Sequence, residues 1–141
     1  MKVAILSESS ADEAAIEVLI AAILRLPMER MQLRRMPSRG WPSVLQNLPA
    51  LIKELHYQTD ADGLVVVADS NHSLPHRPAH DEARGNDDRC RFCLLRSAIE
   101  RTITQLRPVA SRGRLKVAMG LASPAIEAWY LCSENADKVS R

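Results

Sequence analysis

The chain has 141 residues, of which 46% are hydrophobic and 26% charged, and its formal net charge at pH 7 is +2. This composition is typical of one globular domain. The longest apolar stretch, residues 14–26, contains Glu17 and Arg25 and is too short to span a bilayer. The three cysteines are an odd and sparse set, so we expect a reducing compartment and no disulfide scaffold.

The first six residues bear on location. They enter a strand pattern directly and carry no small-residue cleavage site, which argues against a signal peptide. We therefore expect a cytoplasmic protein with no membrane partner.

The first strand and helix are expected near the start of the chain. Residues 2–6 form a continuous apolar strand pattern, and a helix pattern follows to about Leu26. Ser9 and Ser10 offer hydroxyl caps, and Ser10 stands at capping-box spacing from Glu13.

A second strand and helix follow. Residues 31–36 alternate apolar and basic side chains, as a half-exposed strand does, and residues 37–40 form a loop signal. Residues 41–57 place apolar side chains at helical spacing, with a kink or restart expected at Pro49.

The second half contains the strongest strand signal. Residues 64–68 are a branched apolar run without alternation, which predicts an interior strand covered on both faces. Residues 70–88 are polar and too long for an ordinary connection. A helix pattern over 90–106 and a strand over 115–119 follow, and Ser123 before a proline predicts a further helix start.

This order predicts an α/β fold. We expect one domain over residues 1–141, with a long polar loop at about 70–88. Its core would be a three-layer, Rossmann-like arrangement in which helices cover both faces of a mainly parallel, four-stranded sheet.

Two acidic residues follow strand patterns. Glu8 comes after the first strand, and Asp69 ends the strand at 64–68. Carboxyl ends of parallel strands meet at one edge, so the two carboxylates are expected close together, where they would suit Mg²⁺. The alternative is that strands end at the surface, where acidic residues are common.

Histidine and cysteine gather in and after the long loop. The residues are His72, His76 and His80, followed by Cys90 and Cys93. The two cysteines with two of the histidines would suit a tetrahedral Zn²⁺ site that orders the loop. The alternative is that the cysteines begin a helix face and the histidines are solvated or contact phosphate.

Arginine is much more common than lysine and is clustered. Guanidinium groups suit phosphate contact, so a nucleic-acid partner is expected, although solvated helix faces give the same pattern. The arginines assigned to nucleic-acid binding are Arg77, Arg84, Arg89, Arg91 and Arg96.

Three segments carry a resemblance to a known fold. Residues 3–13 resemble the first TOPRIM motif, in which a strand ends in glutamate and a second acid follows four positions later. Residues 69–71 are similar to its Asp-x-Asp motif. Residues 122–131 resemble the Glu-Ala-Trp helix start of a little-characterised bacterial TOPRIM-like family. That family is related to the overcoming-lysogenisation-defect nucleases, which are associated with phage defence.

The resemblance implies a Mg²⁺- or Mn²⁺-dependent nuclease or related phosphoryl-transfer enzyme. Glu8, Asp69 and Glu127 would be its catalytic carboxylates, since such chemistry needs cations that neutralise phosphate and activate water. The implied metal ligands are Glu8, Asp12, Asp69, Asn71 and Glu127.

Two departures from the pattern keep a second function open. Ser9 stands where the family commonly has glycine, and Asn71 replaces the second aspartate of the central motif. Asn71 favours a non-catalytic TOPRIM-like module that binds nucleic acid or a partner protein, such as the ATPase of a defence system, or forms a homo-oligomer. No phosphate-binding glycine loop is present, so ATP hydrolysis by this chain is not expected.

Overall fold

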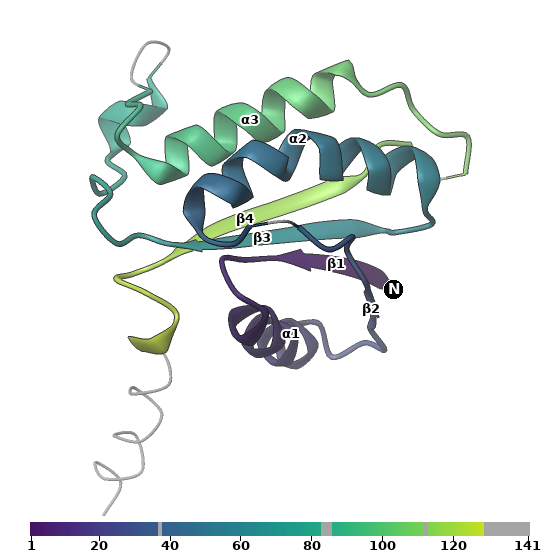
Figure 1. Ribbon diagram of the computed structural model, residues 1–141. Helices are drawn as coiled ribbons and strands as arrows, with labels where there is room; N and C mark the ends of the chain where they lie inside the picture. The colour runs from purple at the N-terminus through teal and green to yellow at the C-terminus, as the bar shows by residue number, and fades with distance from the viewer. Residues whose placement is uncertain (37, 83–85, 112, 129–141) are drawn as a thin grey trace, which may run out of the picture.

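The computed structural model of the protein describes residues 1–36, 38–82, 86–111 and 113–128. Four strands, β1 (Lys2–Leu6), β2 (Glu29–Met31), β3 (Gly63–Asp69) and β4 (Lys116–Ala122), form one sheet in the order β2-β1-β3-β4. Every neighbouring pair is parallel. Helix α1 (Ser10–Leu24) covers one face, and α2 (Trp41–Gln58) and α3 (Arg91–Gln105) cover the other (Figure 1). The predicted α/β fold with helices on both faces of a parallel sheet is confirmed.

The interior position of β3 follows from its side chains. Leu64 and Val66 are buried in the core beneath α2 and α3, whereas Val65 and Val67 belong to the cluster on the α1 side. Alternate residues of a strand face opposite sides, so an apolar run without alternation fills both layers. Complete burial of each such side chain stabilises the fold by about 1.5–3 kcal/mol.

Helix α1 is capped by Ser9, one of the two expected hydroxyl caps. The Ser9 side chain accepts a hydrogen bond from the Asp12 backbone N–H at 3.2 Å. The expected capping box between Ser10 and Glu13 is therefore wrong, and the Glu13 carboxylate instead accepts from arginines. The helix ends at Leu24, two residues before the expected end.

Strand β2 is shorter and earlier than expected. It covers Glu29–Met31 and not 31–36, because its register pairs only three residues with β1. Leu33 and Met36 pack against the core beneath α2 and α3. The apolar and basic pattern of residues 31–36 therefore reflects the packing of a connecting segment against the core and not strand pairing.

Helix α2 continues through Pro49 without the expected restart. Leu48, Leu51 and Ile52, which flank the proline, are almost completely buried. Packing of this apolar face holds the helix together across the missing backbone N–H.

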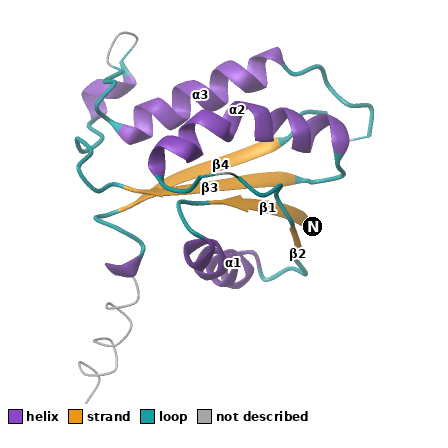
Figure 2. Ribbon diagram, in the orientation of Figure 1, coloured by secondary structure: helices purple, strands orange, loops and turns teal. Residues whose placement is uncertain are grey.

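The segments beyond β3 and β4 show two further differences. The long loop contains a single-turn 3-10 helix, Pro78–Asp81, next to the start of α3 (Figure 2). The Ser123–Pro124 peptide is cis, and helical conformation begins only at Glu127, so the expected cap and first helical position are wrong. The expected continuation to Leu131 lies outside the described residues. None of the helices in the described ranges is long and apolar enough to cross a membrane.

Candidate metal centres

Four acidic residues lie around the carboxyl ends of β1, β3 and β4, and we call them the acidic rim: Glu8, Asp12, Asp69 and Glu127. The closest link joins β1 to β3, where the Asp69 backbone N–H donates to Oε1 of Glu8 at 2.9 Å. Oδ1 of Asp69 accepts from the backbone N–H of Ile126 at 3.0 Å, which ties β3 to the segment after β4. Parallel pairing thus brings the Glu8 carboxylate to the Asp69 backbone, but the carboxylates of Glu8, Asp69 and Glu127 do not gather closely enough to share one ion.

The charge of the acidic rim acts on Asp69. Burial raises the pKa of this carboxyl, and the negative charges of Glu127 and Asp12 raise it further. The hydrogen bond from Ile126 and the positive charge of Arg91 oppose the shift. Asp69 therefore lies in a negative field that Arg91 only partly offsets.

Arg91, the first residue of α3, bridges the Glu8 carboxylate and the Asp69 backbone carbonyl. Its guanidinium NH1 donates to the Asp69 carbonyl at 2.7 Å and to Oε1 of Glu8 at 3.3 Å. Its guanidinium carbon also stands 4.8 Å from the ring centroid of Trp41. Glu8 is therefore already held by two donors, while Asn71 lies in an exposed turn.

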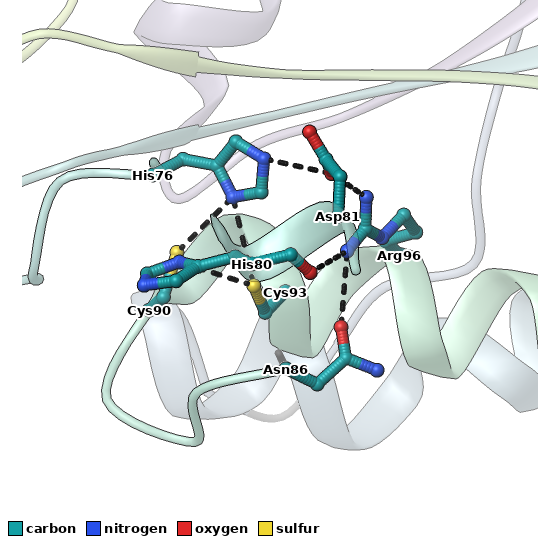
Figure 3. Close-up of polar contacts among 7 residues, drawn as sticks. All are labelled: His76, His80, Asp81, Asn86, Cys90, Cys93 and Arg96. Atoms are coloured by element: carbon teal, nitrogen blue, oxygen red, sulfur yellow. Dashed lines mark hydrogen bonds and ion pairs between the residues drawn. The ribbon is translucent and has the colours of Figure 1, made fainter. Parts of the chain in front are cut away.

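A second group lies beside α3, and we call it the His-Cys cluster: His76, His80, Cys90 and Cys93. Its ligand atoms all lie within 4.8 Å of one another (Figure 3). Among the described residues, these four form the one group of three or more histidine, cysteine or acidic side chains that lie close enough to share an ion. The carboxylates of the acidic rim do not lie close enough to form such a group. His72 is exposed and is not part of the cluster.

The distances within the His-Cys cluster match tetrahedral coordination. Nδ1 of His76 lies 3.7 Å from the Cys90 sulfur and 3.6 Å from the Cys93 sulfur, and Nδ1 of His80 lies 3.6 Å from the Cys93 sulfur. Zinc bonds of about 2.3 Å to sulfur and about 2.05 Å to nitrogen place such atoms about 3.6 Å apart at a tetrahedral angle. These three pairs already have the tetrahedral spacing, and all four ligand atoms lie within 4.8 Å of one another, so small shifts would let the four side chains hold one metal ion.

Helix α3 positions the two thiols. Cys90 is its N-cap and Cys93 lies in its first turn, and both are buried free cysteines. Burial raises the pKa of the Cys90 thiol. Cys90 and Cys93 thus begin a helix and also form a candidate ligand pair, because both sulfurs face the loop that carries the histidines (Figure 3).

An outer shell of polar groups orients the histidines. Nε2 of His76 contacts Oδ1 of Asp81 at 3.1 Å, which leaves Nδ1 to face the thiols. Arg96 pairs with Asp81, donates to the His80 carbonyl at 2.9 Å and reaches Oδ1 of Asn86 at 3.0 Å (Figure 3). The Arg96 hydrogen bond is the main cause that lowers the pKa of Asp81, and His76 adds to it. Such carboxylate–histidine pairs fix the ring of a metal ligand.

The arginines assigned to nucleic acid fall into two sets. Arg77 and Arg89 are exposed, although Arg89 also pairs with Asp87. Arg91 and Arg96 are half-buried and hold the acidic rim and the His-Cys cluster. Arg84 lies outside the described residues.

Sequence reasoning did not single out Asp81 or Trp41 as part of either site. Asp81 directly follows His80, and this adjacency was its only local signal. The contact of Trp41 with Arg91 joins the start of α2 to the start of α3. The two residues are far apart in the sequence, and no motif predicts their contact.

Comparisons with family models, with curated proteins and with solved structures found no match to this chain.

Proposed function

We propose that the protein is a TOPRIM-like, Mg²⁺- or Mn²⁺-dependent phosphodiesterase acting on nucleic acid, with a structural zinc ion in the His-Cys cluster. The observation that carries the enzymatic part is the acidic rim. Glu8, Asp69 and Glu127 come from three different strand ends, and the pKa of Asp69 is raised partly by its acidic neighbours. Concentrated negative charge at the carboxyl edge of a parallel sheet is suited to a hard cation.

The donor set of the rim fits such a cation. The four carboxylates of the acidic rim, and the side-chain carbonyl of Asn71 outside it, offer the oxygen ligands that Mg²⁺ and Mn²⁺ prefer. A bound ion would offset charge on a phosphate and lower the pKa of an attacking water. Arg91 supplies positive charge beside the Glu8 carboxylate, and its planar fork carries further donors that suit a phosphate oxygen.

The exposed arginines support a nucleic-acid substrate. Arg77 is exposed in the loop that follows β3, and Arg89 is exposed near its end, where it also pairs with Asp87. Arginine contacts of this kind position a phosphate backbone without reading its bases. The proposal therefore assigns no sequence preference.

The identity of the second metal follows from its ligands. Two thiol and two imidazole groups at tetrahedral spacing favour zinc over Mg²⁺ or Mn²⁺, which prefer oxygen. Four protein ligands leave no open position for water, so the zinc would stabilise the loop and take no part in hydrolysis.

One observation favours a second candidate function. The carboxylate of Glu8 already accepts from Arg91 and from the Asp69 backbone, and Asn71 adds no negative charge. A non-catalytic TOPRIM-like module that binds nucleic acid, or a partner ATPase of a phage-defence system, would need no cation at this rim.

Cleavage of single- and double-stranded DNA and RNA distinguishes these functions. The zinc-loaded protein is assayed with Mg²⁺, with Mn²⁺ and with neither, because EDTA would also remove the zinc. We expect metal-dependent cleavage that Glu8→Gln and Asp69→Asn both abolish. Glu100→Gln, which changes an exposed acid on α3, is the matched control and should cleave normally. Binding without cleavage under every metal would favour the non-catalytic module.

Zinc is tested separately by elemental analysis of the purified protein. One equivalent is expected. Replacement by Co²⁺ should give the visible spectrum of a tetrahedral thiolate site, and an octahedral spectrum would exclude the His-Cys cluster as its site.

A further inference from the structure

Arg91 connects the two candidate centres. In the sequence it stands between the ligands Cys90 and Cys93, and its backbone belongs to the first turn of α3. Its guanidinium group points the other way, to the Asp69 carbonyl and the Glu8 carboxylate. The start of α3 therefore carries two candidate zinc ligands, Cys90 and Cys93, together with the arginine side chain that contacts the acidic rim.

The backbone around Arg91 is also fastened to the loop after β3. The Arg91 N–H donates to the Ser73 hydroxyl at 2.9 Å, and the Leu74 N–H donates to the Arg89 carbonyl at 3.2 Å. The same loop continues to His76 and His80. The loop and the start of α3 thus form one unit, and the His-Cys cluster lies at its centre.

The loop part of this unit is held by polar contacts and buries little apolar surface. The single-turn helix Pro78–Asp81 contains no buried residue. Cys90 caps α3 without a side-chain hydrogen bond to the helix, so the first turn lacks the usual capping contact. A few apolar contacts cannot offset the conformational entropy of ordering such a loop, whereas four metal–ligand bonds can.

We propose that metal binding at the His-Cys cluster sets the position of Arg91, and through Arg91 the arrangement of Glu8 and Asp69 at the acidic rim. The inference rests on the zinc site of the proposed function and extends it to control of the rim by zinc. Arg91 is then a positioning residue: the metal fixes its backbone, and its guanidinium group fixes the carboxylate of Glu8.

Trp41 provides a readout that needs no enzymatic activity. Its ring lies 4.8 Å from the guanidinium carbon of Arg91, and the chain has two tryptophans. Replacing the other one, Trp129→Phe, leaves Trp41 as the only tryptophan. Zinc sulfate is added to the metal-depleted protein while Trp41 fluorescence, bound zinc and far-ultraviolet circular dichroism are recorded.

We expect a Trp41 fluorescence change that saturates at one equivalent of zinc. In the same background, Arg91→Ala should still bind one equivalent but lose the fluorescence change. Arg91→Lys should keep a reduced change, because lysine retains the charge without the planar stacking group. The lysine variant also supplies the comparison if the alanine variant does not fold.

Two results would overturn the coupling while leaving the zinc site intact. One is stoichiometric zinc binding with no change at Trp41, and the other is an unaltered change in the Arg91 variants. If no zinc binds to the wild-type protein, the zinc site of the proposed function fails and the coupling fails with it. The zinc measurement separates this outcome from the first two.

Discussion

The His-Cys cluster and the acidic rim lie on either side of Arg91 and are built in opposite ways. In the cluster, imidazole nitrogens and thiol sulfurs already stand 3.6–3.7 Å apart. In the rim, Glu8 and Asp69 accept hydrogen bonds from backbone N–H groups, and Arg91 bridges the Glu8 carboxylate and the Asp69 carbonyl. Groups that can be neutral approach closely without an ion, whereas carboxylates repel one another unless a cation is present. A zinc site can therefore be formed in advance, whereas a magnesium site made of acids closes only around its ion.

The largest expected effect is on the preformed site. Cys93→Ser removes a ligand that contacts both histidines, so zinc affinity should fall by more than about 100-fold, because even loss of an outer-shell partner costs about 10–100-fold. Competition with a zinc-binding dye measures the change. Cys132→Ser, the same substitution at the third cysteine, is the control and should retain zinc; equal losses in both variants would contradict the cluster.

The outer shell gives a smaller effect on the same site. Asp81→Asn weakens the contact that orients His76, and we expect zinc affinity to fall by about 10–100-fold while one equivalent still binds. Glu82→Gln, which changes the exposed acid that follows Asp81 in the sequence, should leave the affinity unchanged. A normal affinity in Asp81→Asn would show that Asp81 does not support the cluster.

Glu13 shows whether every acid near the rim serves a metal. Its buried carboxylate accepts from Arg30 at 2.9 Å and from Arg39 at 3.1 Å. Glu13→Gln should lower the free energy of unfolding by about 2 kcal/mol, as expected for hydrogen bonds to charged groups. The increase in melting temperature on adding Mg²⁺ should be unchanged.

Glu17 is the matched control for Glu13. It also pairs with Arg30, but its side chain is 38% exposed. Glu17→Gln should cost less than about 1 kcal/mol, as exposed ion pairs do. If both variants lose the same stability, burial of Glu13 is not the reason for its contribution.

The smallest expected effect is a gain in stability. The pKa of Asp69 in the folded state is raised above its ordinary value of 3.8. Between the ordinary and the raised pKa, the folded state therefore binds more protons than the unfolded state. Stability is therefore lost across that interval, and ionised Asp69 is a net cost at neutral pH. Asp69→Asn should be more stable than wild type at pH 7, and the difference should disappear below about pH 4.

Urea unfolding at several pH values measures this difference. Mg²⁺ should stabilise the wild type at pH 7 and should not stabilise Asp69→Asn, because only the carboxylate binds the ion strongly. Equal stabilisation of both proteins by Mg²⁺ would place the cation away from Asp69.

Local periodicity was sufficient for the framework of the molecule. The unbroken apolar run of β3 predicted an interior strand, and the helical spacing in α2 predicted its buried face. The positions of Glu8 and Asp69 after strands predicted that they would meet, because parallel strands share one carboxyl edge. These features depend on which side of an element is buried, and the order of apolar residues records that directly.

The tertiary structure decided which partners each polar group has. It selected His76 and His80 but not His72, brought Asp81 behind His76, and placed Arg91 between the two sites. It also selected Ser9 over Ser10 as the cap of α1 and shortened β2. A hydrogen bond or metal ligand set depends on a few tenths of an ångström between segments far apart in the chain, and that distance is set only when the helices and the sheet pack together.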